Sequence, residues 1–203
     1  EEEAMAEASR CIECKNPGCV KQCPVSVKIP QFISKVKVGD FEAAAHILAE
    51  DTALPAVCGR VCPQESQCEE TCILGKKGEA VSLGKLERFV ADWARDNKIE
   101  LSKKVDSNGK KVAIVGAGPS GLTCGGDLAK MGYDVTIFEA LHEAGGVLVY
   151  GIPEFRLPKK EVVQYEVENV RKLGVKIIND VIVGKSITID ELLNEEGFSA
   201  VYI

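Results

Sequence analysis

The sequence lacks the features that mark membrane proteins and nucleic-acid-binding proteins. It has no apolar run close to the roughly 18 residues that span a bilayer, and its acidic start, EEEAMAEASR, is the opposite of the basic n-region of a signal peptide. It also lacks an excess of basic residues: the 203 residues carry a net charge of -6, whereas a nucleic-acid footprint needs clustered Lys and Arg. We therefore expect a soluble, cytoplasmic protein with no membrane and no nucleic acid among its partners.

Histidine is scarce as well, with only two residues in the chain and no pair at ligand spacing, so we assign the histidines no chemistry. Cysteine is abundant instead. Eight of the nine cysteines form two tight groups, which are Cys11, Cys14, Cys19 and Cys23, and then Cys58, Cys62, Cys68 and Cys72. Because a reducing compartment disfavours disulfides, thiols clustered in this way indicate metal binding.

The first cysteine group loosely matches the spacing of a bacterial ferredoxin. It ends, at Cys23 and Pro24, on the Cys-Pro pair with which ferredoxins pass a fourth thiolate to a second cluster. A 4Fe-4S cluster takes four anionic ligands, so eight thiolates would supply two clusters. A four-thiolate zinc site usually combines two short C-x2-C pairs, and this chain has one, at Cys11 and Cys14. The spacing therefore favours iron-sulfur clusters over zinc, with a disulfide framework as a weaker alternative.

The hydrophobic pattern divides the chain into two parts. Up to about residue 108 it predicts helices joined by cysteine-bearing loops, and the polar stretch 102–111 is typical of a linker. From there the pattern changes to the alternation of strand and helix that builds a parallel, doubly wound sheet. We expect an α-helical iron-sulfur domain over residues 1–108 and an α/β Rossmann-like domain over residues 109–203.

The same pattern predicts the individual elements. We expect a turn opened by Pro30 and a short helix capped at residue 188 or 190. One further predicted helix ends near residue 10, and four others cover 41–50, 81–97, 120–132 and 159–173. The predicted strands cover 112–116, 134–139, 175–178 and 199–203.

The second part opens with a phosphate-binding motif. The run VAIVGAGPSGL places Gly116, Gly118 and Gly121 in the G-x-G-x-x-G pattern between a predicted strand and a predicted helix. The first glycine permits a tight turn, the second lets the backbone approach a pyrophosphate, and the third allows close packing of helix on strand. The helix N-terminus offers N–H groups to the phosphates, and Glu139, at the end of the next strand, would accept hydrogen bonds from ribose hydroxyls. This context makes a glycine-rich turn without a ligand the weaker interpretation.

The motif by itself does not distinguish FAD from NAD. Glu139 is followed by the doublet Gly145 and Gly146, which would bring a second stretch of backbone against the same pyrophosphate. That second contact favours FAD, so we interpret the second part as a Rossmann-like FAD-binding domain.

Five motifs in this order resemble one protein family. They are EASRCIECKNPGCVKQCPV, LPAVCGRVCPQESQCEETC, LGKLERF, GAGPSGL and GGVLVYGIPEFRLPK, and the resemblance covers essentially the whole chain. The family is that of the small (beta) subunit of NADPH-dependent glutamate synthase. Similar modules form the large subunit of electron-bifurcating NADH-dependent ferredoxin:NADP oxidoreductase and the amino-terminal part of dihydropyrimidine dehydrogenase.

The resemblance implies a ligand set for each cluster. One cluster takes the first three cysteines of the first group and the last of the second group, here Cys11, Cys14, Cys19 and Cys72. The other takes Cys23, Cys62, Cys68 and a non-cysteine ligand that matches Glu87. Spacing alone would instead make Cys58 the eighth ligand and leave Glu87 a solvated carboxylate, so both are candidates. Because a carboxylate donates less electron density than a thiolate, a Glu87 ligand would give the two clusters different potentials.

The resemblance also implies the contacts of FAD. The ribose would meet Glu139, Arg156 would lie near the phosphates or the flavin, and Ile182 would contact adenine through its backbone. The residues implied at the phosphates are Gly118, Pro119, Ser120, Gly121, Gly146 and Val147. No catalytic side chain is implied.

The resemblance finally implies an activity for the intact protein. Electrons from NADPH or NADH would pass through FAD and two 4Fe-4S clusters to the large subunit of glutamate synthase, which makes glutamate from glutamine and 2-oxoglutarate, or to another electron-accepting subunit. Family members continue beyond the equivalent of Ile203 into a segment that completes the FAD site and into a second dinucleotide domain. We therefore expect a fragment that does not turn over alone and whose NAD(P)H site lies outside the chain. Its incomplete sheet has an exposed edge that favours pairing with a second copy.

Other interpretations remain open. Within the family, the alternative is the electron-bifurcating oxidoreductase. Outside it, the chain would be a non-catalytic redox-sensing module, or a zinc-stabilised scaffold with an adenylate-binding Rossmann domain. Electron transfer to an acceptor distinguishes the sensing module from the oxidoreductase, and metal analysis distinguishes the zinc scaffold.

Overall fold

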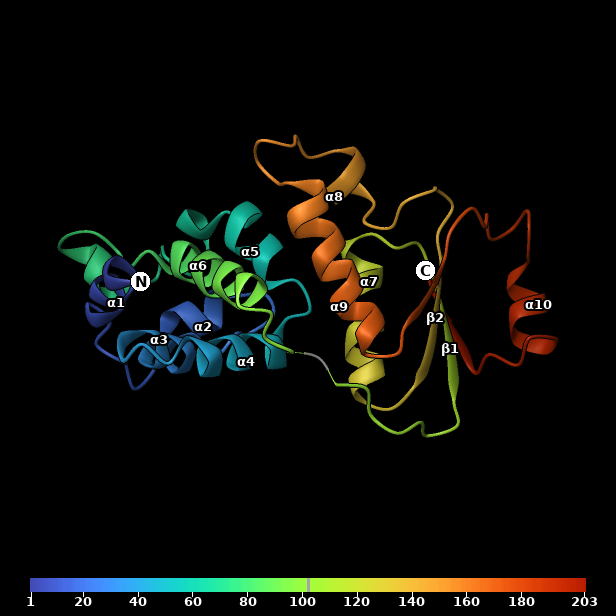
Figure 1. The fold of residues 1–203 in the computed structure, drawn as a ribbon, viewed down its shortest axis with the longest axis horizontal. Helices are drawn as coiled ribbons and strands as arrows, with labels where there is room; N and C mark the ends of the chain where they lie inside the picture. The colour runs from blue at the N-terminus through green and yellow to red at the C-terminus, as the bar shows by residue number, and fades with distance from the viewer. Residues whose placement is uncertain (102) are drawn as a thin grey trace. The chain divides into compact units, whose positions relative to one another are not determined.

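The computed structural model describes residues 1–101 and 103–203 (Figure 1). Residue 102, the first residue of the predicted linker, lies outside the described residues. Residues 1–101 and 103–203 form two compact units. The first unit is helical and the second contains a parallel sheet, so the predicted fold class and the order of the two parts are confirmed.

The boundary between the units lies before the predicted one at residue 108. Ser107 Oγ donates to Asp134 Oδ2 over 2.7 Å, and the Asn108 amide donates to the carbonyl of Gly132 over 2.8 Å. These bonds tie the polar stretch before the first strand to the turn that precedes the second strand. Residues 107 and 108 therefore belong to the second unit.

The first unit is built from α-helices and short 3-10 turns. They are α1 (Glu2–Ser9), α2 (Gly18–Gln22), α3 (Ile29–Lys37), α4 (Phe41–Asp51), α5 (Pro55–Val61), η1 (Gln64–Ser66), η2 (Ile73–Lys76) and α6 (Leu83–Asp96). Pro30, which was expected to open a turn, lies in the first turn of α3. The short helices α2 and α5 lie where the sequence predicts cysteine-bearing loops. The sequence does not indicate these helices, because segments this short show no helical period. No helix in the described part of the chain is long and apolar enough to cross a membrane.

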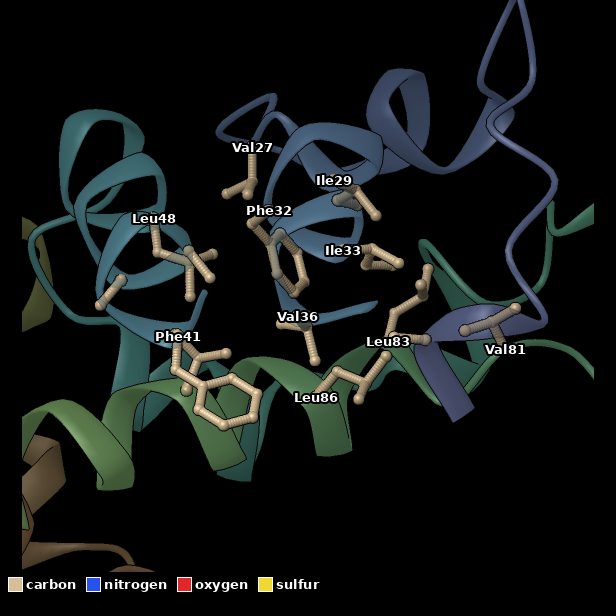
Figure 2. Close-up of a cluster of buried hydrophobic side chains, with 14 of the residues drawn as sticks. Val27, Ile29, Phe32, Ile33, Val36, Phe41, Leu48, Val81, Leu83 and Leu86 are labelled. Atoms are coloured by element: carbon tan, nitrogen blue, oxygen red, sulfur yellow. The ribbon is translucent and has the colours of Figure 1, made fainter. Parts of the chain in front are cut away.

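One apolar core holds the helices of the first unit together (Figure 2). Phe32, Ile33 and Val36 lie on one face of α3, and each is at most 1% exposed. They belong to the same cluster as Leu48 of α4 and Leu86 of α6. Burial of each such side chain contributes roughly 1.5–3 kcal/mol relative to its exposure. The core also positions thiols, since the cysteines packed against it are Cys11, Cys19, Cys23, Cys68 and Cys72.

The second unit alternates strands and helices. Its elements are β1 (Lys111–Val115), α7 (Pro119–Lys130), β2 (Asp134–Phe138), α8 (Val147–Tyr150), η3 (Lys159–Val163, a π-helical turn), α9 (Gln164–Lys172), β3 (Lys176–Ile178), α10 (Ile189–Asn194) and β4 (Ala200–Tyr202). The strands are parallel, in the order β3-β2-β1-β4. α7 packs on β1 and β2, with α9 beside it, and α10 lies on the other side of the sheet next to β4 (Figure 1). Every strand predicted from the sequence is present, whereas α8 was not predicted.

The parallel register brings the carboxyl ends of β1 and β2 to one edge of the sheet. Ile114 of β1 pairs with Ile137 of β2 and with Tyr202 of β4. Just beyond β1, the amide of Gly116 donates to the carbonyl of Phe138 over 2.8 Å. The glycine-rich loop and Glu139 therefore meet at the same edge.

α5 and α6 approach each other closely at Gly59. A Cβ added to Gly59 would lie 2.5 Å from the amide nitrogen of Arg88 and 2.7 Å from its Cα. Both atoms belong to the backbone of α6, which has no rotamer that would relieve the collision. Glycine at position 59 is therefore a requirement of helix packing.

Gly59→Ala should destabilise the first unit by about 1–3 kcal/mol, because the added methyl group forces the two helix backbones apart. Chemical denaturation followed by circular dichroism measures the change. Gly78→Ala is the matched control, since an added Cβ there comes no closer than 4.0 Å to atoms beyond its chain neighbours. Equal stability of the two variants would contradict the tight contact.

Candidate functional site: two cysteine-lined cavities and a glycine-rich loop

Four predicted cluster ligands line one cavity of the first unit. The cavity has a volume of about 510 Å³, and its cysteines are Cys11, Cys14, Cys19 and Cys72. The first two lie between α1 and α2, the third lies in α2, and the fourth directly precedes η2. The fold thus brings the last cysteine of the second group to the first three of the first group. Their role as ligands stays a prediction.

Polar contacts join the end of α1 to the segment that follows the second cysteine group. Arg10 donates to the carbonyl of Ala80 over 3.2 Å, and the Glu7 carboxylate accepts from the amide of Ser82 over 2.8 Å. Burial opposes ionisation of Glu7, but the hydrogen bonds from Ser82 and the charge of Arg10 lower the pKa of Glu7 overall. These bonds hold Cys11, the residue after Arg10, in place at the cavity.

A smaller cavity, of about 100 Å³, lies among the other predicted ligands. Its lining includes Cys23, Cys62, Cys68 and Glu87, and also Cys58. Cys23 directly follows α2, Cys58 lies in α5 and Cys62 directly follows it, while Glu87 lies in α6. Both candidates for the eighth ligand therefore line the same cavity, and the choice between Cys58 and Glu87 stays open.

The two cavities share part of their walls. Ile29, at the start of α3, and Leu83, at the start of α6, line both cavities, and each is 4% exposed. At these points one apolar side chain separates the two sets of donors. The sequence does not indicate this partition, because nothing in it distinguishes these two residues from other core residues.

Burial and nearby negative charges raise the pKa of one thiol in each cavity. Burial raises the pKa of Cys19 to about 11, and the charges of two neighbouring thiolates of the first cavity add to it. Burial raises the pKa of Cys68 to about 12, with further contributions from the negative charges of Glu69 and Glu87. Bound cations would compensate this repulsion, because a metal ligates and stabilises the thiolate form.

The pKa of Cys62 is shifted in the opposite direction from that of Cys68 in the same cavity. A hydrogen bond from Cys58 lowers the pKa of Cys62 to about 7, against the opposing effect of burial. Thr52 Oγ1 in turn lies 3.9 Å from the sulfur of Cys58. Through this contact Cys58 favours the thiolate form of Cys62, whichever of Cys58 and Glu87 binds metal.

The donors surround each cavity and do not converge on one point. Within residues 1–101 and 103–203, no three side chains of His, Cys, Asp or Glu lie close enough together to hold a single metal ion. A zinc ion requires its ligands about 2–2.3 Å from one centre. A 4Fe-4S cluster instead binds its ligands at separate iron atoms, so a donor set spread around a cavity fits it better.

The three motif glycines of the second unit meet different requirements of the fold. Gly116 has a φ of +95°, a conformation that favours glycine. A Cβ on Gly121 would collide with the carbonyl oxygen of Gly116, so α7 packs directly on the loop. A Cβ on Gly118 would meet nothing within 4 Å. The fold therefore leaves open space at Gly118, where we predict that a pyrophosphate approaches.

Glu139 is buried after the end of β2 and braces the glycine-rich loop. Its carboxylate oxygens accept from the amide of Ala117 over 2.6 Å and from the amide of Leu141 over 2.9 Å. The glycine-rich motif does not indicate this bracing role. Each carboxylate oxygen keeps a further lone pair for a ribose hydroxyl, so ribose binding by Glu139 stays a prediction.

The glycine doublet lies against the glycine-rich loop. The amide of Gly145 donates to the carbonyl of Ala117 over 2.8 Å, and a Cβ on Gly146 would lie 2.8 Å from the Cα of Gly118. Val147 follows as the first residue of α8 and is exposed. Two stretches of backbone therefore border the space at Gly118, as the predicted pyrophosphate site requires.

Two of the remaining predicted FAD contacts, Ser120 and Ile182, already have hydrogen-bond partners within the protein. Pro119 is the first residue of α7, and Arg156 is exposed. Ser120 Oγ lies 2.7 Å from the hydroxyl of Tyr202, a partner that the motif did not indicate. The amide of Ile182 already donates to Ser186 Oγ over 3.2 Å, so an adenine contact through that N–H would have to replace this bond.

Comparison with known protein families matches both units. Residues 1–99 match the family described as dihydropyrimidine dehydrogenase domain II with a 4Fe-4S cluster, and residues 114–173 match the NAD(P)-binding Rossmann-like domain. The chain therefore consists of a helical 4Fe-4S domain followed by a Rossmann-like dinucleotide-binding domain.

Individual relatives match nearly the whole chain. It is 38% identical to the NAD-dependent dihydropyrimidine dehydrogenase subunit PreT of Escherichia coli O157:H7 over 95% of its residues. It is also 38% identical, over 100% of its residues, to the glutamate synthase (NADPH) small chains of Escherichia coli K12 and Halomonas elongata. The chain spans 46%, 43% and 42% of the lengths of these three relatives. With this identity along its whole length, the chain belongs to the oxidoreductase family that contains the glutamate synthase small chains and the PreT subunits.

Proposed function

We propose that this chain is the electron-transfer part of an FAD and iron-sulfur oxidoreductase, in which electrons from NADPH or NADH pass through FAD and two 4Fe-4S clusters to a partner subunit. One observation carries the proposal. The donors gather around two cavities, four cysteines at the first, and three cysteines with Glu87 and Cys58 at the second. Membership in a family of oxidoreductase subunits supports the same conclusion.

The residues of the chain fit these cofactors. The first cluster would take Cys11, Cys14, Cys19 and Cys72, and the second would take Cys23, Cys62 and Cys68 with Glu87. The glycine-rich loop and the doublet would hold the pyrophosphate of FAD, because they border a space that the fold leaves open. When bound, FAD would accept an electron pair as a hydride and release single electrons, which the clusters carry.

The walls of the cavities would tune this electron transfer. Ile29 and Leu83 line both cavities with apolar side chains, which would exclude water from the space between the two donor sets. Lys15 and Lys76 line the first cavity, whereas no Lys or Arg of the described residues lines the second. Because nearby charge and ligand type both set the potential of a cluster, the two clusters would differ in potential.

For the partner, we propose the large subunit of a glutamate synthase, so that the electrons serve the synthesis of glutamate from glutamine and 2-oxoglutarate. The match to glutamate synthase small chains along the whole chain supports this choice. A second candidate is a dihydropyrimidine dehydrogenase subunit, favoured by the match to PreT and by the family of residues 1–99. Electron transfer from the chemically reduced protein to either candidate partner, measured as turnover of the corresponding substrate, distinguishes the two candidates.

We place this reaction in the cytoplasm, because thiol-ligated iron-sulfur clusters suit a reducing compartment. β3 and β4 are the edges of the described sheet. Pairing of one such edge with a second copy of the chain stays a prediction.

Anaerobically purified protein should contain about eight iron atoms and about eight acid-labile sulfide ions per chain, from two four-iron clusters. Iron analysis combined with sulfide determination measures both. Two zinc atoms without sulfide would refute the proposed function and favour the scaffold interpretation.

Glu87→Ala should remove the second cluster or change its potential, because one iron loses its protein ligand, while Cys58→Ser should keep both clusters. A redox titration followed by electron paramagnetic resonance measures the number of clusters and their potentials. The two variants are matched, since both change a side chain that lines the same cavity. The opposite pattern would assign the eighth ligand to Cys58.

Gly118→Ala should weaken FAD binding at least tenfold, or by about 1.4 kcal/mol, because its methyl group would enter the space reserved for the pyrophosphate. The stability of the protein should not change, since an added Cβ meets no atom of the fold within 4 Å. Titration of FAD followed by flavin fluorescence measures the affinity, with Gly78→Ala as the control. Wild-type affinity in the Gly118 variant would place the pyrophosphate elsewhere.

A further inference from the structure

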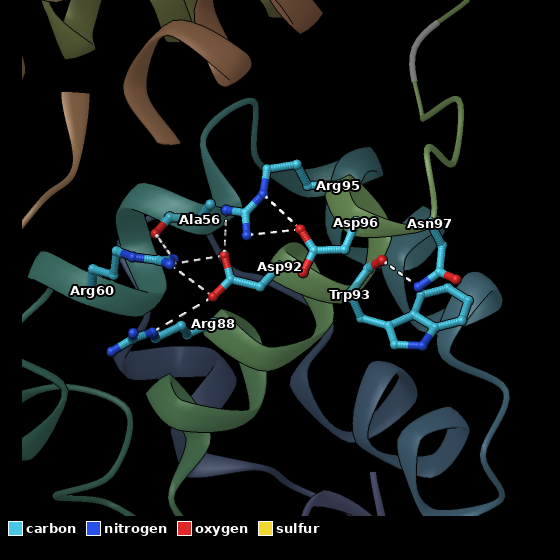
Figure 3. Close-up of polar contacts among 8 residues, drawn as sticks. All are labelled: Ala56, Arg60, Arg88, Asp92, Trp93, Arg95, Asp96 and Asn97. Atoms are coloured by element: carbon cyan, nitrogen blue, oxygen red, sulfur yellow. Dashed lines mark hydrogen bonds and ion pairs between the residues drawn. The ribbon is translucent and has the colours of Figure 1, made fainter. Parts of the chain in front are cut away.

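Arg60 of α5 lies buried against α6 (Figure 3). Its side chain is 6% exposed, and its Nη2 donates to both carboxylate oxygens of Asp92 over 2.8 and 2.7 Å. Its Nη1 donates to the carbonyl of Ala56, one turn earlier in α5, over 3.1 Å. Because Asp92 lies in α6, this ion pair connects the two helices that carry donors of the second cavity.

The order of residues in α5 places the ion pair beside the cavity and outside it. Successive helical residues point about 100° apart. Cys58 lines the second cavity, Gly59 touches the backbone of α6, and Arg60 reaches Asp92. The helix contact at Gly59 is therefore flanked by the thiol on one side and by the ion pair on the other.

In α6, too, a cavity-lining residue, a helix-contact residue and an ion-pair residue follow one another along the chain. Glu87 lines the cavity, the next residue, Arg88, meets Gly59, and Asp92 lies one turn further on. A change in the separation or rotation of the two helices at the ion pair would therefore be transmitted across the Gly59 contact to Glu87 and the thiols. The small volume of the cavity, about 100 Å³, leaves little room for such a change.

We propose that Arg60 and Asp92 are positioning residues for the second cluster. Their ion pair sets the separation between Cys62, which directly follows α5, and the carboxylate of Glu87 in α6. This inference rests on the proposed function, since it assumes that the second cavity holds a cluster. It assigns no metal contact to either residue.

The other partners of Asp92 supply a matched control. Arg95 Nη1 lies 2.8 Å from Asp92 Oδ1, and Arg88 Nε lies 3.7 Å from Oδ2. Both arginines belong to α6, so their contacts with Asp92 do not connect it to α5 (Figure 3). They also leave Asp92 paired when Arg60 is removed, which avoids the large cost of an isolated buried charge.

The test compares Arg60→Met and Arg95→Met with the wild-type protein, all purified anaerobically. Iron and sulfide content, the electron paramagnetic resonance spectra of the reduced proteins and the cluster potentials are measured. Arg60→Met should lose about half of the iron, or keep the second cluster at a shifted potential. The first cluster should stay as in the wild type, because none of the described α5 residues lines its cavity. Arg95→Met should match the wild type throughout.

Arg60→Lys separates positioning from folding. A lysine keeps the charge but lacks the planar guanidinium, so it should restore the second cluster in part. Wild-type spectra and potentials in Arg60→Met, or equal defects in Arg60→Met and Arg95→Met, would overturn the inference. Loss of both clusters in Arg60→Met without recovery in Arg60→Lys would also overturn it, since that result assigns Arg60 to folding of the whole unit. A wild-type protein without iron would instead refute the proposed function.

Discussion

The contact between α5 and α6 at Gly59 is the constraint on which the second cavity depends. The backbone of Arg88 lies 2.5 Å from where a Cβ of residue 59 would be, so any larger residue would push α6 away. Glu87 precedes Arg88 and Cys58 precedes Gly59, and both line the cavity. In each helix, the residue that makes the contact therefore directly follows the residue that lines the cavity. The packing of Gly59 against Arg88 consequently determines the spacing between Cys58 and Glu87.

The apolar core of the first unit also shapes the two cavities. Helix packing around Phe32 and Ile33 places Ile29 and Leu83 between the two cavities, where they separate the donor sets. Side chains that stabilise the fold thus also form the wall between the two cavities. In the second unit, Glu139 combines roles in a similar way, because the carboxylate predicted to bind ribose also braces the glycine-rich loop through Ala117.

The sequence predicts local chemistry better than three-dimensional surroundings. The strand, loop and helix around Gly116 follow from neighbouring residues, and the structure contains all three. The sharing of the first cavity by Cys11 and Cys72 was implied only by resemblance, because no spacing rule links residues so far apart. Spacing could not separate Cys58 from Glu87, and the fold places both at one cavity. The roles of Arg60, Ile29 and Leu83 were not predicted, since buried ion pairs and shared walls depend on contacts between distant segments.

We propose that the helical unit binds two separate iron clusters, one in each cysteine-lined cavity. Anomalous X-ray scattering at the iron edge, from anaerobically grown crystals of the holoprotein, would locate the iron atoms. Two resolved iron peaks are expected, one among Cys11, Cys14, Cys19 and Cys72, and one among Cys23, Cys62, Cys68 and Glu87, with Ile29 and Leu83 between them. A single iron peak, or peaks at the zinc edge in place of the iron edge, would contradict it.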